Sequence, residues 1–124
     1  TVAVLFLIVL NISLCVSTSV KQINIGLKDL NKISESKSQY NVLFGSNSCI
    51  YCKYMDEIYK KAFVDSGIKE YYYINLTYEG QNEDILLEKN IEEIPVIVQY
   101  VDGQEKKRLS GTSNVEEVIH FLCD

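Results

Sequence analysis

The pattern of hydrophobic and polar positions changes its period along the chain, and this change predicts alternating helices and strands. Apolar side chains recur at helical spacing in residues 27–33, 49–64 and 113–122, and residues 84–90 predict a further short helix with Ile85, Leu86 and Leu87 available for burial. Short runs rich in β-branched and aromatic residues lie between them, at residues 40–44, 71–76, 95–101 and 104–109. This order favours an α/β fold in which helices pack on a central sheet.

Local signals predict where several of these elements begin and end. Pro95 stands at the start of a strand, a position where proline is tolerated. Asp102-Gly103 is a two-residue hairpin signal, so we expect the strands on either side of it to pair antiparallel. Ser113 and Glu116 have the spacing of a capping box and predict the start of the last helix.

Residues 1–19 differ from the rest of the chain. Residues 2–10 are an unbroken apolar run, and the polar residues that follow carry no charge. This pattern is typical of a secretory signal, and we expect cleavage near Ser17–Ser19. A membrane-spanning helix needs about 20 apolar residues, so permanent anchoring is the less favoured alternative. The prediction is an exported protein, periplasmic or otherwise extracytoplasmic, which is secreted or tethered through its N-terminal segment.

Composition and charge narrow the possible functions of the remaining domain, residues 20–124. The chain has 124 residues, of which 47% are hydrophobic, and this suits one core rather than two. Its 17 acidic and 12 basic residues give a net charge of -5. Because such a surface repels a phosphate backbone, nucleic acid is excluded as a partner. We expect one compact, monomeric domain without repeats or linkers.

Cys49 and Cys52 are the candidate functional residues. A Cys-x-x-Cys pair is compatible with a redox dithiol, half of a zinc site or a structural disulfide. Here the pair follows a buried strand and opens a helix, where free N–H groups and the helix dipole stabilise a thiolate. We therefore expect Cys49 to be the nucleophile and Cys52, about one turn later, to resolve a mixed disulfide. Ile50 and Tyr51, between the cysteines, are candidates for contact with partner proteins.

Several motifs resemble the thioredoxin superfamily over residues 22–123. They are Phe44, Cys49-Ile50-Tyr51-Cys52-Lys53, Ile94-Pro95, and Asp102-Gly103 followed by Arg108-Leu109-Ser110-Gly111. A narrower likeness, to the exported subgroup that includes the C-terminal domain of bacterial thiol:disulfide interchange reductases, lies in three runs. These runs are Cys52–Asp56, Ala62–Asp65 and Ile74–Thr77.

The resemblance implies a thioredoxin fold, with a central mixed sheet of four to five strands flanked by helices. It implies that Pro95 is in the cis form beside the dithiol and that Ile94 offers its backbone to an extended substrate segment. It also implies disulfide exchange with protein thiols and disulfides through the Cys49-Cys52 pair, without an organic cofactor. The subgroup favours a reductase that a membrane protein supplies with electrons, over an oxidase that an oxidant protein keeps oxidised.

Two positions depart from the family pattern. Typical thioredoxins have a buried acidic residue in the strand before the motif and a tryptophan before the first cysteine, whereas this chain has Leu43 and Ser48. The proton acceptor that assists Cys52 is therefore missing or supplied differently. Glu92 and Glu93 are the candidates for that role.

The sequence is also compatible with two other functions. One is a binding module that keeps the thioredoxin fold and uses Cys49-Cys52 as a permanent disulfide. The other is a zinc site formed by Cys49, Cys52, His120 and Cys123, which are residue types that bind zinc. The zinc site is less favoured, because local zinc modules place their two ligand pairs closer together in the sequence.

Overall fold

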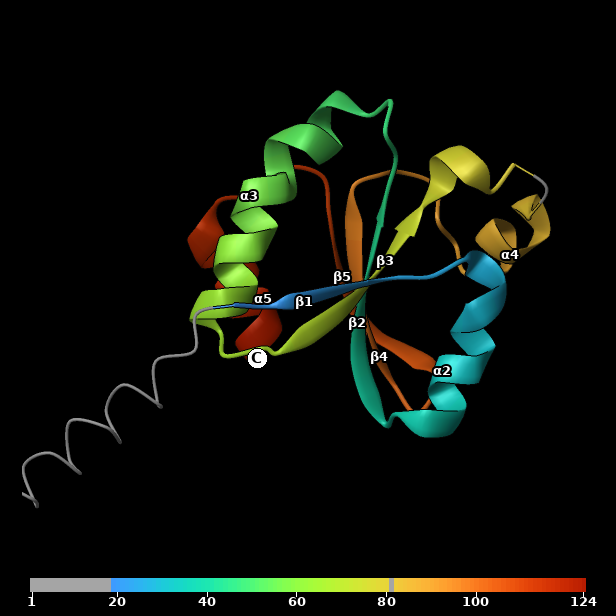
Figure 1. The fold of residues 1–124 in the computed structure, drawn as a ribbon, viewed down its shortest axis with the longest axis horizontal. Coiled ribbons are helices and arrows are strands. Elements are labelled where there is room, and N and C mark those ends of the chain that lie inside the picture. The colour runs from blue at the N-terminus through green and yellow to red at the C-terminus, as the bar shows by residue number, and fades with distance from the viewer. Residues whose placement is uncertain (1–18, 81) are drawn as a thin grey trace, which may run out of the picture.

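A computed structural model of the chain describes residues 19–80 and 82–124. The predicted leader, residues 1–19, lies outside the described residues except for its last position. The described part is a five-stranded sheet with helices on both faces (Figure 1), and none of its helices is long and apolar enough to cross a membrane. Two short 3-10 turns are Leu27–Asp29 and Leu76–Tyr78. The other elements are β1 Lys21–Asn24, α2 Leu30–Ser36, β2 Gln39–Gly45, α3 Ile50–Asp65, β3 Glu70–Asn75, α4 Glu83–Glu88, β4 Val96–Val101, β5 Gln104–Ser110 and α5 Val115–Cys123.

The strand order β1-β3-β2-β4-β5 places β2 at the centre of the sheet. β1 and β2 both run parallel to β3, whereas β4 is antiparallel to β2 and to β5. Phe44, near the end of β2, pairs with Ile74 of β3 and with Val96 of β4. The start of β4 therefore lies beside the end of β2. This arrangement confirms the predicted α/β fold with a mixed central sheet.

The two faces of the sheet bury separate clusters of side chains. Because successive side chains of a strand point to opposite faces, Val42 and Phe44 of β2 pack on one face and Leu43 packs on the other. α2 and α4 cover the first face, and α3 and α5 cover the second (Figure 1). Phe63 of α3 stacks on Tyr71 of β3, with ring centroids 4.1 Å apart. This contact helps to fix α3, which begins at the cysteine pair, against the sheet.

The observed elements follow the predicted order, with differences of a few residues at their ends. The Asp102-Gly103 turn has φ angles of 52° and 81° and joins two antiparallel strands, as predicted. β1 was not predicted from the sequence, because it is a short edge strand whose residues are mostly exposed. The predicted capping box at Ser113 is wrong. Asn114 is the N-cap of α5 and accepts a hydrogen bond from the Glu117 N–H at 2.8 Å.

Candidate functional site

The paired cysteines lie at the junction between β2 and α3. β2 ends at Gly45, and Cys49 is the N-cap residue of α3. The sulfur of Cys49 accepts a hydrogen bond from the backbone N–H of Cys52 at 3.1 Å. This N–H belongs to the first turn of the helix, where such groups have no partner within the helix. It is therefore available to stabilise a thiolate at Cys49.

The second cysteine lies in a different environment. Both thiols are free and half-buried. Burial, and after it the neighbouring Cys49 thiol, raises the pKa of Cys52 to about 12. Cys52 therefore keeps its proton at neutral pH and must lose it before it can attack another sulfur, because the thiolate is the nucleophilic form.

The loop before β4 forms the opposite wall of the site. Its Ile94–Pro95 peptide bond is cis, and Pro95 is buried. The carbonyl oxygen of Ile94 accepts a long hydrogen bond from the Cys49 thiol at 3.9 Å. Pro95 lines a small cavity together with Cys52, and its own carbonyl accepts a hydrogen bond from the Gly111 N–H at 2.8 Å. The fold thus brings the dithiol and the Ile94–Pro95 loop together.

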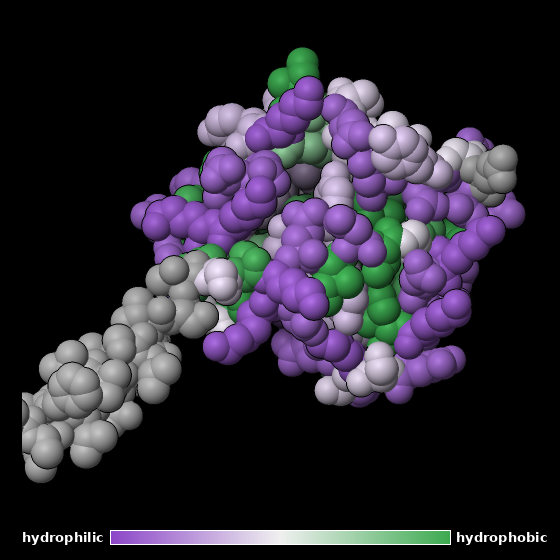
Figure 2. All heavy atoms as spheres, viewed as in Figure 1, coloured by the Kyte–Doolittle hydropathy of each residue, from purple (hydrophilic) through white to green (hydrophobic). Residues whose placement is uncertain are grey.

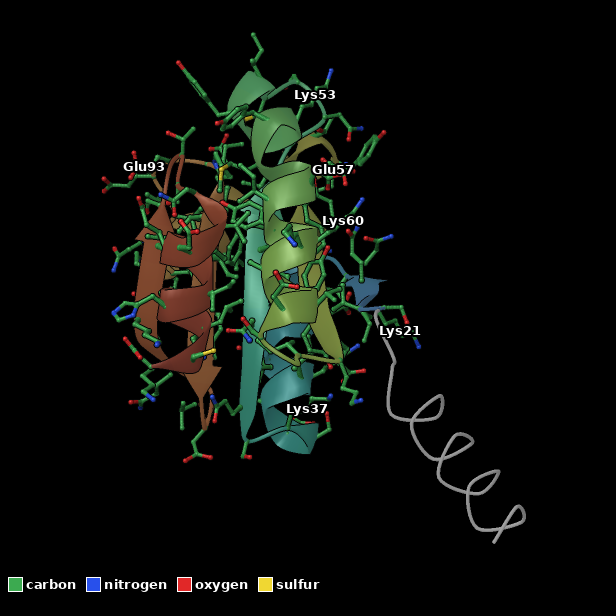
Figure 3. All side chains as sticks on the ribbon, turned by 90° about the vertical axis from the view of Figure 1, so that its left-hand side faces the viewer. Lys21, Lys37, Lys53, Glu57, Lys60 and Glu93 are labelled. Atoms are coloured by element: carbon green, nitrogen blue, oxygen red, sulfur yellow. The ribbon has the colours of Figure 1, made fainter. Side chains whose placement is uncertain are left out.

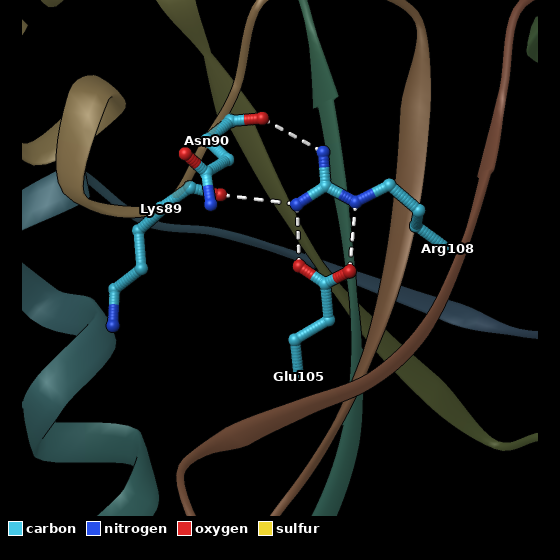
Figure 4. Close-up of polar contacts among 4 residues, drawn as sticks. All are labelled: Lys89, Asn90, Glu105 and Arg108. Atoms are coloured by element: carbon cyan, nitrogen blue, oxygen red, sulfur yellow. Dashed lines mark hydrogen bonds and ion pairs between the residues drawn. The ribbon is translucent and has the colours of Figure 1, made fainter.

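Arg108 of β5 holds the segment that leads into this loop (Figure 4). Its guanidinium group donates hydrogen bonds to the carbonyl oxygens of Lys89 at 3.0 Å and Asn90 at 2.8 Å. The same group pairs with both carboxylate oxygens of Glu105. Asn90 has a φ of 55°, so these Arg108 hydrogen bonds hold the chain where it turns sharply after α4. Bidentate pairing of this kind fixes direction as well as distance.

A second polar cluster holds the loop that precedes Cys49. The Thr77 hydroxyl accepts a hydrogen bond from the Asn47 N–H at 2.9 Å and lies 2.8 Å from the Ser46 hydroxyl. The side chain of Asn75, at the end of β3, donates to the side-chain oxygen of Asn47 at 2.8 Å. The loop is therefore tied to β3 and to the turn that follows it.

A cavity of about 110 Å³ lies behind Cys52. Its polar lining includes Cys52, Asp56 and Tyr59 of α3 and Tyr73 of β3. Tyr59 is 2% exposed, and its hydroxyl has no hydrogen-bond partner among the described residues. Burial first, and then the two cysteine thiols, raises the pKa of Tyr59 above its usual range. A space of this size has room for water.

Exposed apolar side chains surround the mouth of the site. Ile50 is 79% exposed, and Tyr51 and Tyr54 are each 63% exposed. Tyr78 is also exposed, and its hydroxyl accepts a hydrogen bond from the Asn47 side chain at 3.2 Å. Figure 2 shows polar atoms over most of one face of the molecule and a hydrophobic prominence at the end where α3 begins. We call Ile50, Tyr51, Tyr54 and Tyr78 the apolar rim.

The predicted proton acceptors Glu92 and Glu93 do not lie in the site. Both are exposed, and neither lines the cavity behind Cys52. Figure 3 shows Glu93 at the outer edge of the molecule. Asp56, four residues after Cys52 on the same face of α3, lines that cavity instead.

The four residues proposed as zinc ligands do not come together. His120 and Cys123 lie on α5, where both are exposed and His120 pairs with Asp124 at 2.7 Å. Over residues 19–80 and 82–124, no three His, Cys, Asp or Glu side chains lie close enough to hold a metal ion. Cys49 and Cys52 therefore form a site without the second pair.

Comparison with solved structures identifies similar folds. A thioredoxin from Malassezia sympodialis is 18% identical and aligns with a TM-score of 0.67 over 88% of this chain and 96% of that one. Reduced thioredoxin from Schistosoma mansoni is 17% identical and gives 0.67 over 82% and 95%. A chain of the complex between ferredoxin:thioredoxin reductase and thioredoxin f2 is 13% identical and gives 0.69 over 86% and 96%. No protein-family model matches the sequence, and a comparison with curated proteins finds no match. The chain therefore has the thioredoxin fold.

Proposed function

We propose that this protein exchanges disulfides with protein thiols through Cys49 and Cys52. The observation that carries the proposal is the position of the Cys49 sulfur, 3.1 Å from the Cys52 N–H and 3.9 Å from the Ile94 carbonyl oxygen. The N–H favours the thiolate at Cys49, and the carbonyl marks where substrate backbone would pass. Cys52 lies one helical turn further on, within reach of a sulfur bound to Cys49.

The exchange has two steps. The Cys49 thiolate attacks one sulfur of a substrate disulfide, which forms a mixed disulfide and releases the other substrate sulfur as a thiolate. Cys52 then loses its proton and attacks the Cys49 sulfur, which closes the Cys49–Cys52 disulfide and releases the second substrate thiolate. The substrate gains two electrons and the protein loses two, so the reaction needs no organic cofactor.

The proposed substrate-binding residues are Ile94, Pro95, Ile50 and Tyr51. An extended substrate segment beside Ile94 would hydrogen-bond to its backbone, as in strand addition. The exposed Ile50 and Tyr51 side chains would contact apolar residues that flank the substrate cysteine, because partly exposed aromatic and aliphatic anchors carry much of the energy of protein contacts.

We further infer that the protein acts as a reductase outside the cytoplasm. The apolar leader and the resemblance to the exported subgroup support this location and direction. Thioredoxin f2 forms a complex with ferredoxin:thioredoxin reductase, which shows that a protein of this fold associates with a protein reductase. We propose by analogy that a thiol-containing membrane protein returns the Cys49–Cys52 disulfide to its reduced form.

Trapping of the mixed disulfide tests the function. Cys52→Ser removes the resolving thiol, so a protein substrate with an accessible disulfide should stay covalently bound to Cys49 on a non-reducing gel. Cys49→Ser should form no adduct, whereas Cys123→Ser, which removes an exposed thiol on α5, should turn over the substrate as the unchanged protein does. Absence of an adduct with Cys52→Ser would contradict the proposal.

The reduction potential separates a catalyst from a binding module with a permanent disulfide. It is measured in glutathione buffers on the Cys123→Ser protein. A value near about -270 mV is expected for a reductase, and a value near about -120 mV would reverse the direction of electron flow. A value below about -300 mV would indicate a permanent disulfide and replace the proposed function with the binding module.

A further inference from the structure

A groove of about 480 Å³ lies at the ends of β1 and β3. Asn24 and Asn75, the last residues of these parallel strands, are in its lining. Tyr73 lines both this groove and the cavity behind Cys52, and Tyr78 of the apolar rim lines the groove as well. The groove therefore shares side chains with the reaction site and with the surface around it.

The charged side chains in the groove are both acidic. Asp29 and Glu79 are half-buried in a lining that, among the described residues, includes no lysine, arginine or histidine. One carboxylate oxygen of Asp29 accepts the Gly26 N–H at 3.0 Å, and one of Glu79 accepts the Leu27 N–H at 3.2 Å. The other Glu79 oxygen accepts a hydrogen bond from the Asn82 side chain at 2.6 Å. In the described part of the chain neither carboxylate pairs with a basic side chain, so the groove holds two negative charges without a counter-charge.

Capping of the turn after β1 explains where these two side chains lie but not why both are charged. Glu79 ends the turn after β3, and the two turns lie side by side (Figure 1). Gly26 permits this approach, because a Cβ at that position would lie 3.0 Å from the Glu79 Oε1 atom. Asparagine caps backbone N–H groups about as well as aspartate does, so neutral side chains would satisfy the same contacts. The two charges are therefore available for a cation.

We propose that this groove binds an arginine side chain of the protein substrate while Cys49 attacks the substrate disulfide. The inference rests on the proposed function, because the groove adjoins that reaction site. A guanidinium group can donate hydrogen bonds to both carboxylates, and its flat face can stack on a tyrosine ring. The Tyr78 ring, which is 77% exposed, offers such a face. The favoured substrates are then proteins with an arginine close to the reactive cysteine.

The groove is within reach of a substrate bound at Cys49. β1 is two strands from β2, and neighbouring strands lie about 4.8 Å apart, so the groove is about 10 Å from the end of β2. Because an extended chain rises about 3.3 Å per residue, the arginine should lie about three to five residues from the substrate cysteine. The substrate would pass from Ile94 across Tyr78 to the groove. The net charge of -5 attracts a basic segment from further away.

Matched peptides test the preference for arginine. Each peptide has one cysteine, linked by a disulfide to thionitrobenzoate, and the two members of a pair differ only in having arginine or citrulline at one position. Citrulline keeps the length and shape of arginine but has no charge. Pairs with this residue about three, four or five positions from the cysteine, on either side, are compared. Attack by Cys49 on the cysteine sulfur releases the coloured thiolate, so the rate of its release measures the first step.

The full chain carries Cys15→Ser and Cys123→Ser, so that Cys49 and Cys52 are the reacting thiols. In at least one pair, the arginine peptide should react about tenfold faster than the citrulline peptide at low salt, because charge-assisted hydrogen bonds form in the groove. The same ratio measured with dithiothreitol corrects for the effect of the charge on the disulfide itself. High salt should lower the corrected ratio, because salt screens exposed charges.

Asp29→Asn with Glu79→Gln removes both charges and keeps the oxygens that cap the turn. In this double variant the corrected ratio should fall to about one, and the citrulline peptide should react as it does with the unchanged protein. Each single substitution should lower the ratio part of the way, so the test does not depend on the double variant alone. Glu116→Gln with Glu117→Gln is the matched control, since it removes two exposed charges on α5 outside the groove. It should keep the ratio.

Equal corrected rates within every pair for the unchanged protein overturn the preference for arginine. A preference that the Asp29→Asn and Glu79→Gln double variant retains overturns the groove as its source. Failure of the proposed function gives a different result. If the unchanged protein releases no coloured thiolate, or if Cys52 never frees the bound peptide, the exchange function is wrong. If it turns over both members of every pair at equal corrected rates, the exchange function stands and the role assigned to the groove is wrong.

Discussion

The thiol of Cys49 hydrogen-bonds at 3.9 Å to the backbone carbonyl oxygen of Ile94, a residue 45 positions away in the sequence. Cys49 follows β2 and Ile94 precedes β4, and these strands pair antiparallel through Phe44 and Val96. The loop after β2 and the loop before β4 therefore meet at the same end of these two internal strands. The contact between nucleophile and substrate loop depends on the register of the sheet, and the loops themselves need separate anchors.

The reactivity of the two site cysteines should differ strongly. Limited treatment with iodoacetamide at about pH 8 should modify Cys49 and leave Cys52 as a thiol, because burial and the neighbouring thiol raise the pKa of Cys52 to about 12. Mass spectrometry of the digested protein measures both, with the exposed Cys123 as the reference thiol. Equal modification of Cys49 and Cys52 would contradict the difference in their environments.

The hydrogen bonds that hold the loop before Cys49 should depend on the Thr77 hydroxyl. Thr77→Val removes the hydroxyl that accepts the Asn47 N–H, so hydrogen exchange of the Asn47 amide should become faster by about fivefold, the effect of one hydrogen bond worth about 1 kcal/mol. Thr112→Val, in the exposed turn before α5, is the control and should leave that amide unchanged. An unchanged Asn47 amide in Thr77→Val would show that other contacts hold the loop.

The anchor of the Ile94 loop should depend on Arg108. Arg108→Lys keeps the charge but cannot reach both backbone carbonyls and both Glu105 oxygens, so urea unfolding should show a loss of about 1–3 kcal/mol. Lys106→Ala, at an exposed position of the same strand, should change the free energy of unfolding by less than about 0.5 kcal/mol. Equal stability of Arg108→Lys and the unchanged protein would mean that the Arg108 hydrogen bonds contribute nothing to the free energy of unfolding.

Local sequence predicted the parts of this fold that local physics determines. The Asp102-Gly103 turn was predictable because only residues that tolerate positive φ suit a two-residue hairpin. The helix start at Cys49 was predictable from a strand, a polar loop and an amphipathic stripe in succession. Near α5, Ser113 and Asn114 are both good capping residues, and the sequence pattern alone selected the wrong one.

What escaped prediction depends on contacts between distant segments. β1 is short, polar and exposed, and it exists as a strand because it pairs with β3. Tyr59 fits the apolar stripe of α3, and nothing in its spacing shows that its hydroxyl is buried without a partner. Glu92 and Glu93 were chosen for their charge near the proline loop, but both are exposed and neither lines the cavity behind Cys52.

The burial of Cys52 also predicts how stability depends on pH. A free cysteine has a pKa of about 8.5, and in the folded protein burial raises that of Cys52 to about 12. Between these values the folded state holds a proton that the unfolded state has released, so the free energy of unfolding must fall as pH rises. Below this window both states are protonated and Cys52 contributes no pH dependence. Tyr71, whose pKa burial also raises to about 12, adds to the fall in the same direction.

Substitution of Cys52 isolates its share of this effect. Urea unfolding of the reduced protein between about pH 8.5 and pH 11 should lose stability more steeply with Cys52 present than in Cys52→Ala, because the variant has no thiol whose ionisation favours unfolding. Cys123→Ala, which removes an exposed thiol, should keep the slope of the unchanged protein. Identical slopes for Cys52→Ala and the unchanged protein would mean that Cys52 ionises as easily in the folded state as in the unfolded one. The resolving thiol would then need no proton acceptor beyond solvent.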